Sequence, residues 1–192
     1  MPASRQVIVI TGVPGVGKTS AAMNLAKLMK GSHIDLSAFS HDQRLITGRD
    51  EEGETSIVDL VEIRKRLRSL LSSSDGHLII EGHFAPAVIA HDVPDFIFVL
   101  RKAPWVLKQE LEERSYSRDK VRENVEAELI GVCLTEAIEA FGKDRVCEID
   151  TTDRCVDDVA QEIFSTINGE RLCSRGKVDW LDFSDPNWLL EG

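Results

Sequence analysis

Short runs of consecutive hydrophobic residues alternate along the chain with longer stretches whose apolar residues recur at helical spacing. The hydrophobic runs occupy residues 6–10, 33–36, 77–80, 95–100 and 146–149. Runs of this length without polar alternation are typical of strands that are buried on both faces. Because helical stretches separate the runs, they predict an α/β fold in which helices cover both faces of a central parallel sheet.

The helical stretches and one insertion complete the predicted order of elements. Helices are predicted at residues 19–30, about 57–71, 104–114 and 156–167. A further helix is expected to continue to Gly142, because one face carries Val121, Val125, Leu129 and Val132 at helical spacing. Residues 37–74 lie between the second and third strands, and their polar, acidic first half predicts an insertion or a lid-like segment.

The composition indicates a single folded domain of acidic character. The 192 residues are 42% hydrophobic and 29% charged, which supports a core and excludes a disordered chain. The formal net charge of -10 argues against broad binding of nucleic acid or anionic lipid, so that any anion site must be local. The hydrophobic runs are far shorter than the roughly 20 residues that span a bilayer, and residues 1–5 lead into a strand without a signal peptide. We therefore expect a soluble cytoplasmic protein with no membrane partner.

The cysteines and the C-terminal tail give weaker indications. The spacing of Cys133, Cys147, Cys155 and Cys173 matches neither a zinc site nor a disulfide framework, so we expect reduced thiols. The polar tail after residue 168 contains three large aromatic residues, Trp180, Phe183 and Trp188. Such a tail either docks on its own domain, which we favour, or binds a partner or a second subunit.

The strongest motif is a phosphate-binding loop between the first strand and the first helix. Residues 12–19 spell G-V-P-G-V-G-K-T and match G-x-x-x-x-G-K-[ST] in the required structural context. Glycines allow backbone N–H groups to point at an anion, and the helix N-terminus adds partial positive charge. Lys18 would reach the β and γ phosphates, Thr19 would bind Mg²⁺, and Ser20 would face the α-phosphate. The loop predicts binding of a nucleoside triphosphate.

The rest of the sequence narrows the class of nucleotide-binding protein. The guanine-reading sequence N-K-x-D does not occur, which disfavours a GTPase, and the chain is too short for a helicase. A small kinase fits the length, and it needs an acceptor site and cations that neutralise the transferring phosphoryl group.

Candidate residues for that chemistry follow the third and fourth strands and the helix at 104–114. Glu81 and His83 come directly after a buried strand, at the edge where open α/β sheets bind ligands. We expect Glu81 to contribute to the Mg²⁺ site, and His83 and Arg101 to assist catalysis near the γ-phosphate. Arg114 begins a cationic break between helices that suits a lid, whereas Arg118 and Lys120 are interpreted as a solvated helix start.

These motifs, in this order, resemble the adenylate kinase isoenzyme 6 family, which includes the coilin-interacting nuclear ATPase and archaeal proteins labelled "putative adenylate kinase". The family pattern T-P-G-x-G-K-T-T resembles residues 13–20, and its acidic-x-His pattern resembles residues 81–83. The V-L-R strand end resembles residues 99–101. The most specific match is the lid pattern R-G-Y-x-x-x-K-x-x-x-N-x-x-x-E, which resembles residues 114–128, and residues 178–180 resemble the archaeal branch.

The resemblance implies a P-loop NTPase three-layer sandwich of the small nucleotide-kinase type. It implies an NMP-binding segment at about 35–58, a lid at about 113–123 and an aromatic C-terminal tail at about 170–192, all within one domain. The implied activity is transfer of phosphate from MgATP to AMP, giving two ADP, with an accompanying ATPase activity. The implied catalytic residues are Lys18, His83, Arg101 and Arg114; the implied nucleotide-binding residues are Gly15, Gly17, Lys18, Thr19, Ser20 and Arg114; the implied metal ligands are Thr19 and Glu81. The resemblance also links the chain to ribosomal protein S11 and maturation of the small ribosomal subunit.

Two departures from the family pattern concern the acceptor site and the lid. Residues 39–41 are F-S-H where the family has L-A-R, an arginine suited to the AMP phosphate, and the nearest arginines are Arg44 and Arg49. Ser115 replaces the lid glycine and loses its easy access to positive φ. Three hypotheses therefore stay open: an adenylate kinase, an ATP-hydrolysing assembly factor whose acidic surface attracts a basic ribosomal protein, and a kinase for a non-nucleotide acceptor.

Overall fold

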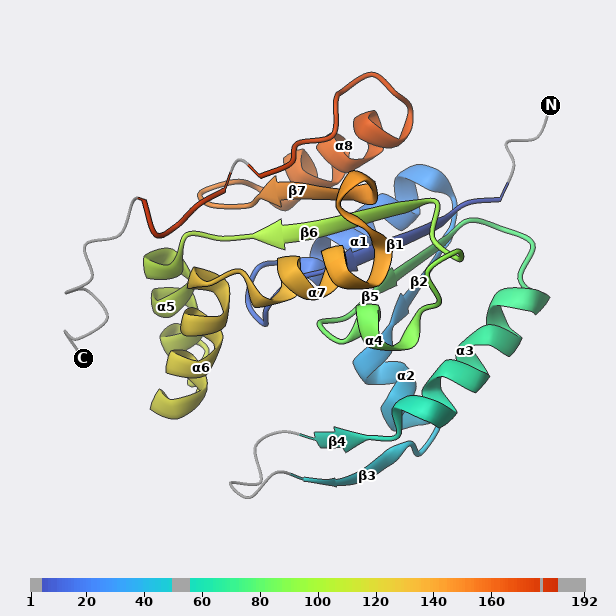
Figure 1. Ribbon diagram of the computed structural model, residues 1–192, viewed down its shortest axis with the longest axis horizontal. Helices are drawn as coiled ribbons and strands as arrows, with labels where there is room; N and C mark the ends of the chain where they lie inside the picture. Colours follow the sequence, from blue (N-terminus) through green and yellow to red (C-terminus); the bar gives the residue numbers. More distant parts are fainter. Residues whose placement is uncertain (1–4, 50–55, 177, 183–192) are drawn as a thin grey trace.

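The computed structural model describes residues 5–49, 56–176 and 178–182, and its centre is a five-stranded parallel sheet (Figure 1). The strand order is β2-β5-β1-β6-β7. The strands are β1 (Val7–Thr11), β2 (Ser32–Asp35), β5 (Leu78–Glu81), β6 (Phe96–Arg101) and β7 (Val146–Asp150). Each of the five predicted hydrophobic runs forms one of them, which confirms the predicted parallel α/β sheet.

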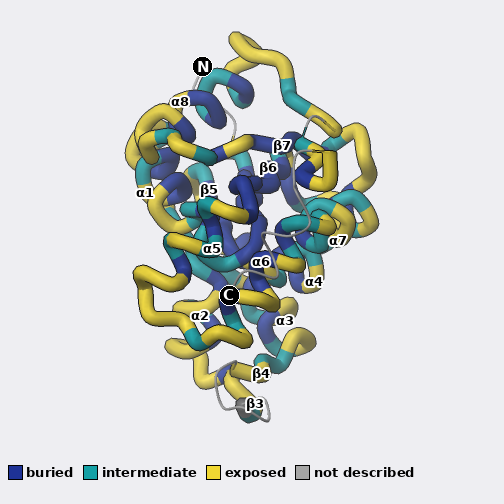
Figure 2. Tube along the Cα trace, turned by 90° about the vertical axis from the view of Figure 1, so that its left-hand side faces the viewer, coloured by how far each residue is buried: buried dark blue, intermediate teal, exposed yellow. Residues whose placement is uncertain are grey.

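Burial on both faces explains the absence of polar alternation in β1, β5 and β6, whereas the edge strand β2 is only partly buried. All five residues of β1 are buried, and Ile8 lies between Ile79 of β5 and Phe96 of β6 in the parallel register. Figure 2 shows the buried strands at the centre of the molecule and the exposed hairpin β3–β4 at one end.

Helices cover both faces of the sheet and make it the middle of three layers. One face carries α1 (Lys18–Met29) and α8 (Val156–Ile167), which pack on each other, and the other carries α4 (Ala85–Val88) and α7 (Val132–Phe141). The remaining helices are α2 (Leu36–Asp42), α3 (Leu60–Ser73), α5 (Pro104–Glu113), α6 (Arg118–Leu129) and the short η1 (Lys143–Arg145). Within the described residues, every helix is too short or too polar to cross a membrane.

The insertion between β2 and β5 has more structure than the sequence indicated. It contains α2, a two-stranded antiparallel hairpin of β3 (Ile46–Arg49) and β4 (Ser56–Val58), and then α3. The expected start of the helix at about residue 57 is wrong, because Asp59 caps α3 and its carboxylate accepts from the Val61 and Glu62 amides at 3.1 and 3.0 Å.

The expected single helix ending at Gly142 is divided into α6 and α7. Gly131 has φ 68°, a left-handed conformation that ends one helix and precedes the next. A Cβ at this position would lie 3.7 Å from the Arg101 guanidinium. The periodicity of the valines continues across the break, which is why the pattern concealed it.

The expectation that all cysteines are reduced is wrong for one pair. Cys147 of β7 forms a disulfide with Cys173, 26 residues later, while Cys133 is a buried free thiol and Cys155 an exposed one. The pairing arises because the chain returns along β7 after α8, where the Glu148 amide donates to the Ser174 carbonyl at 2.8 Å. This return is tertiary structure that cysteine spacing does not reveal.

Candidate active site

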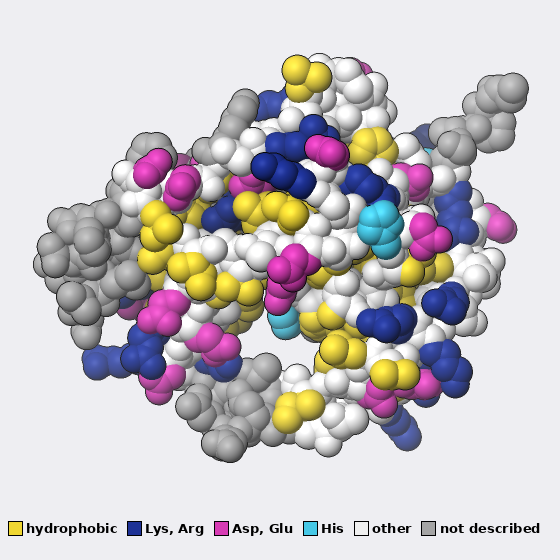
Figure 3. Space-filling model, in the orientation of Figure 1, with side chains coloured by type: hydrophobic (Ala, Val, Ile, Leu, Met, Phe, Trp, Pro, Cys, Tyr) yellow, Lys and Arg dark blue, Asp and Glu magenta, His cyan; other side chains and the backbone are white. Residues whose placement is uncertain are grey.

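A cavity of about 1020 Å³ opens at the carboxyl ends of β1, β2 and β5, and Figure 3 shows the molecule hollowed there. The segment α2–β3–β4 forms one side of the cavity and the start of α6 with the loop before it forms the other. The described lining residues that carry polar or charged side chains are Lys18, Thr19, Asp35, Ser37, Ser40, His41, Ser56, Glu81, His83, Arg114, Ser115, Tyr116, Ser117, Lys120, Glu123 and Asn124.

The phosphate-binding loop forms the floor of this cavity. Gly15 and Gly17 have φ of 97° and 93°, which L side chains rarely adopt. A Cβ at Gly15 would lie 2.6 Å from Leu107 and 3.0 Å from Leu111, both buried in α5. Glycine at position 15 is therefore required by backbone conformation and by the helix packed behind it.

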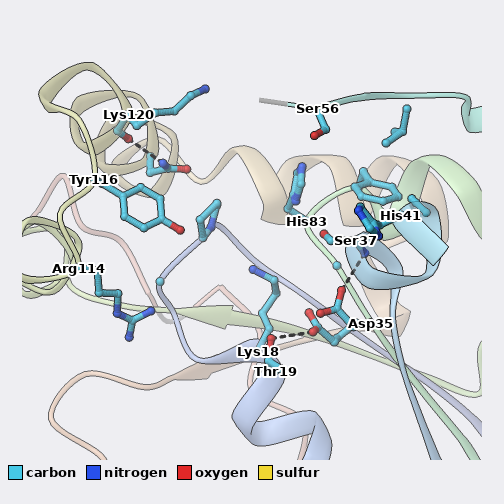
Figure 4. A pocket seen from close by; sticks show the side chains of 18 of the residues that line it. Lys18, Thr19, Asp35, Ser37, His41, Ser56, His83, Arg114, Tyr116 and Lys120 are labelled. Atoms are coloured by element: carbon cyan, nitrogen blue, oxygen red, sulfur yellow. Dashed lines mark hydrogen bonds between the residues drawn. The ribbon is translucent and has the colours of Figure 1, made fainter. Parts of the chain in front are cut away.

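Lys18 and Thr19 begin α1 and face the cavity (Figure 4). The Lys18 ammonium donates to the Val13 carbonyl at 3.0 Å, so its charge is held over the loop. Burial lowers the pKa of Lys18, while the Glu81 carboxylate acts in the opposite direction. The Lys18 amine is thus positioned to release the Val13 carbonyl and donate to a phosphate oxygen instead.

Glu81 ends β5 and pairs with Thr19. The Thr19 hydroxyl donates to Glu81 Oε1 at 2.8 Å, and His33 Nε2 lies 3.7 Å from the same oxygen. Burial by itself would raise the pKa of Glu81, but His33, Thr19 and Lys18 together lower it, so the carboxylate is ionised at neutral pH.

The Thr19 and Glu81 oxygens fit a hard divalent cation such as Mg²⁺. The described residues include no group of three or more His, Cys, Asp or Glu side chains that could hold a metal ion. A cation at this pair would therefore need further oxygens from a phosphate ligand and from water, which is the usual coordination of Mg²⁺ in phosphate-transfer sites.

His83 lies on the cavity wall near Lys18 in Figure 4, and its ring meets Phe84 edge-on with centroids 5.0 Å apart. Desolvation by the surrounding protein lowers the pKa of His83, and the Lys18 charge lowers it further. The structure thus places His83 with the phosphate-binding loop, as the sequence indicated, and favours its neutral form.

Arg101 does not line the cavity, contrary to the expected role near a phosphate. It is 3% exposed, and its guanidinium contacts the carboxylates of Glu128 at 2.7 Å and Glu148 at 3.2 Å. It also donates to the Glu128 carbonyl at 3.0 Å. The side chain points into the protein interior, where it joins β6 to α6 and β7. Ser20 is exposed on α1 and is likewise absent from the cavity lining.

The loop and helix after α5 supply the cations opposite the phosphate-binding loop. Arg114 ends α5 and lies 3.7 Å from Glu110, and Tyr116 points into the cavity (Figure 4). Lys120 also lines the cavity, with 17% of its side chain exposed and Glu123 at 2.6 Å, so its interpretation as a solvated helix start is wrong. Ser115 adopts φ 60°, the conformation that a glycine would adopt more readily.

The opposite side of the cavity is formed by described residues of the segment 35–58, in which the sequence analysis assigned no binding role to an individual residue of this chain. Asp35 ends β2 beside Glu81 in the sheet register, and its carboxylate caps α2 by accepting from the Ser37 and Ala38 amides at 2.8 and 3.1 Å. Its place at the end of a strand was the available signal. Ser37, Ser40 and His41 add two hydroxyls and an imidazole.

Arg44 and Arg49 are the arginines nearest to residues 39–41, and the structure describes the side chain of Arg44 only. Arg44 is exposed in the turn before β3 and does not line the cavity. The side chain of Arg49 and residues 50–55 lie outside the described part of the chain. Among the described lining residues of the segment 35–58, histidine is the only basic type.

Comparisons with known proteins agree with this arrangement. Residues 8–131 match the family model described as an AAA domain. A protein of Saccharolobus islandicus named "Putative adenylate kinase" is 38% identical over 185 residues, which cover 96% of this chain and 92% of the relative. A Methanocaldococcus jannaschii protein of the same name is 35% identical over 176 residues, covering 91% and 93%.

Solved structures share the fold at lower identity. Shikimate kinase from Acinetobacter baumannii, in complex with shikimate, has a TM-score of 0.61 at 18% identity, covering 88% of this chain and 96% of that one. A gluconokinase from Sinorhizobium meliloti 1021 has a TM-score of 0.56 at 15% identity, covering 86% and 93%. These likenesses establish the fold of a small P-loop kinase. With archaeal relatives aligned along almost its whole length, the chain belongs to the family of the proteins named "Putative adenylate kinase" in these organisms, and residues 8–131 match the AAA domain.

Proposed function

We propose that the protein is an adenylate-kinase-like phosphotransferase that converts MgATP and AMP into two ADP. The observation that carries the proposal is one cavity in which the phosphate-binding loop faces the cations of a lid. Lys18 and the Thr19–Glu81 pair lie on the loop side, and Arg114 and Lys120 lie on the lid side.

The donor polyphosphate would bind along the loop amides. Lys18 would leave the Val13 carbonyl to contact the β and γ phosphates, and Arg114 would neutralise charge on the transferring group from the opposite side. Thr19 and Glu81 would hold Mg²⁺, which supplies charge neutralisation to the phosphate oxygens when bound. Gly15, Gly17 and Ser20 complete the proposed nucleotide-binding set, although Ser20 reaches the ligand only if the α-phosphate extends along α1.

The transfer itself needs alignment more than covalent chemistry from the protein. An oxygen of the AMP phosphate forms a bond to the γ-phosphorus as the bond from that phosphorus to the β–γ bridging oxygen breaks. Neutral His83 would donate a hydrogen bond near the γ-phosphate, while Arg101 would act only by holding α6 in place. Closure of the lid would exclude water, which otherwise accepts the phosphoryl group.

A second candidate function is ATP hydrolysis by an assembly factor, with ribosomal protein S11 and the small ribosomal subunit as the partners implied by the resemblance. The observation that favours it is the acceptor side of the cavity, whose described lining has hydroxyls, carboxylate and imidazole in place of an arginine for the AMP phosphate. A hydroxyl-bearing acceptor other than a nucleotide is the third possibility that the same lining leaves open.

The proposal is tested by measuring ADP formation from MgATP with AMP, CMP, UMP, GMP or no acceptor. An adenylate kinase gives ADP as sole product and strong stimulation by AMP, whereas equal ATP consumption with and without AMP would identify the ATPase. Selective stimulation by another monophosphate would reassign the acceptor.

The same assay on Lys18→Ala checks the role of the phosphate-binding loop. The variant should lose activity by about 10²-fold or more, because an aligned cation at the transferring group is removed. Lys27→Ala is the matched control: it removes the same charge from the exposed face of α1, and it should retain wild-type activity. Lys18→Ala activity near wild type would reject the assignment.

A further inference from the structure

The C-terminal strap, defined here as residues 173–176 and 178–182, is held against β7. The Cys147–Cys173 disulfide joins it to the strand, and the Glu148 amide donates to the Ser174 carbonyl at 2.8 Å. The Gly176 amide donates to the Glu148 carboxylate. Figure 1 shows the strap running beside β7 towards α5.

The strap ends at a buried tryptophan that contacts the lid region. Trp180 is 7% exposed, and its ring meets Trp105 of α5 edge-on with centroids 5.9 Å apart. Its indole N–H donates to Glu128 Oε1 at 2.9 Å. Trp180 thereby contacts both helices that flank the loop at 114–117.

Glu128 is the point at which α6 is attached to the sheet. The same oxygen, Oε1, accepts from Arg101 Nε at 2.7 Å and from the Lys102 amide at 3.1 Å. Glu128 is 1% exposed, and burial raises its pKa against the opposing effects of Arg101 and Trp180. Each donor therefore matters for keeping this carboxylate ionised and in place.

The other end of α6 carries the lid residues. Lys120 and Asn124 line the cavity, and Asn124 lies one helical turn from Glu128 on the same face. A helix of twelve residues is a rod of roughly 18 Å, so a change at its anchored end moves the cavity end.

We propose that Trp180 is a positioning residue for nucleotide binding, which fixes the C-terminal end of α6 through Glu128 and so sets how Arg114 and Lys120 meet the polyphosphate. The inference rests on the proposed binding of ATP in the cavity, but it is independent of the acceptor. When the hydrogen bond from Trp180 to Glu128 is lost, the conformation of the lid that binds the phosphates is less populated. The apparent affinity for ATP falls in proportion to the population of that conformation.

The first test compares the wild type with Trp180→Phe, which retains an aromatic ring and removes the N–H donor. Titration calorimetry with MgATP should show a dissociation constant raised about three- to tenfold. Exchange of amide hydrogens in α6 should accelerate relative to that in β1 and β5. Leu181→Ala, at an adjacent exposed position, is the matched control and should leave both readouts unchanged. An ATP affinity within twofold of wild type, or a uniform acceleration of exchange throughout the domain, would show a merely structural role and overturn the proposal.

A double-mutant cycle tests whether Trp180 acts through Glu128. In the Glu128→Gln background, the loss of ATP affinity caused by Trp180→Phe should shrink, because the charged acceptor is already gone. Undiminished loss in that background would mean that Trp180 acts by another route.

The second test needs no variant, because coupling between two sites is reciprocal. Saturating MgATP should slow amide exchange in the strap of the wild-type protein as well as in the phosphate-binding loop and the lid. Protection of the loop and lid with an unchanged strap would refute the coupling, even if ADP formation from AMP were demonstrated. Protection of the loop, the lid and the strap without any phosphorylation of AMP would support the coupling and reject the adenylate kinase activity. Absence of protection at the phosphate-binding loop would reject both the coupling and the proposed function.

Discussion

Arg101 illustrates how burial decides the role of a charged residue. Its guanidinium is shared by the carboxylates of Glu128 and Glu148, and all three side chains are almost fully buried. Taking such charges out of water is costly, and mutual pairing with good geometry offsets that cost. Removing one partner leaves the others buried without compensation.

We predict that Arg101→Ala lowers the free energy of unfolding by about 3–5 kcal/mol, the usual cost of breaking a buried pair. Urea denaturation measures the loss. Arg122→Ala on the exposed face of α6, where 69% of the side chain is accessible, is the control and should change stability by no more than about 0.5 kcal/mol. Full stability of Arg101→Ala together with a large loss in kcat would restore the catalytic role that its position in the sequence indicated.

The buried thiol of Cys133 should be unreactive towards alkylating reagents in the folded protein. Burial raises the pKa of Cys133 to about 11, so at pH 8 only about 0.1% of it is thiolate. Iodoacetamide should therefore modify exposed Cys155 quickly in the native protein and Cys133 only after denaturation, as resolved by peptide mass spectrometry. Rapid labelling of Cys133 without unfolding would contradict its burial.

Sequence reasoning predicted the residues on the phosphate-binding side of the candidate site, because they lie at strand ends and in a motif with fixed geometry. Lys18, Thr19, Glu81 and His83 share the carboxyl edge of a parallel sheet, so their proximity follows from topology. The side-chain directions of Arg101 and Lys120 do not follow from topology, because each depends on which carboxylate lies within reach. Arg101 pairs with carboxylates of α6 and β7, and Lys120 pairs with Glu123 of its own helix.

Among the elements of the fold, the C-terminal strap lies along β7 and connects α5 with α6 through Trp180. The described part of the tail agrees with the docked strap that the sequence favoured, through Trp180, whereas Phe183 and Trp188 lie outside the described residues. The Cys147–Cys173 disulfide closes the chain around α8 and the start of the strap.

This disulfide should stabilise the folded protein by about 3–4 kcal/mol in the chain-entropy model for a loop of 26 residues. Reduction with a dithiol, or the change Cys173→Ser, should lower the urea midpoint accordingly. Cys155→Ser is the control, since its thiol is exposed and unbonded. Equal midpoints for oxidised and reduced protein, or four titratable thiols in the purified protein under non-reducing denaturation, would contradict the prediction.

The elements that the sequence concealed share a physical cause. Strands β1, β5, β6 and β7 were evident because they are mainly apolar, whereas the strands of the hairpin β3–β4 (ITGR and SIV) are short and partly exposed, so they lack a hydrophobic pattern. The end of α6 was missed because Gly131 breaks the backbone without interrupting the periodicity of the valines. Local conformation at one residue can thus divide a continuous amphipathic pattern.

For the whole molecule, an acidic chain places three cationic side chains at one cavity, beside the carboxylates of Asp35, Glu81 and Glu123, so its attraction for phosphate is local to the loop and the lid. The net charge is -10, while Lys18, Arg114 and Lys120 converge on the cavity between the hairpin segment and α6. Figure 3 shows both signs of charge interspersed over the face that contains this cavity. A bound polyphosphate should therefore contact the start of α1, the end of α5 and α6 at the same time.

We predict that MgATP at 100 times its dissociation constant stabilises the protein by about 2.7 kcal/mol. For a domain of this size, that corresponds to a rise in Tm of roughly 5–10 °C. Scanning calorimetry with increasing MgATP measures the shift, and Lys18→Ala should reduce it strongly while Lys27→Ala should not. A Tm that does not respond to millimolar MgATP would remove the basis of the nucleotide assignment.

The contact of Gly15 with α5 restricts how this protein can change during evolution or redesign. The phosphate-binding loop rests directly on Leu107 and Leu111, so that a ligand-contacting backbone and the hydrophobic interior share one surface. A bulkier residue at either leucine would push on the loop amides before it disturbed any side chain in the cavity. Substitutions in α5 that look like ordinary changes of interior volume should therefore alter ligand recognition, and this helix is a poor choice for volume-increasing stabilisation.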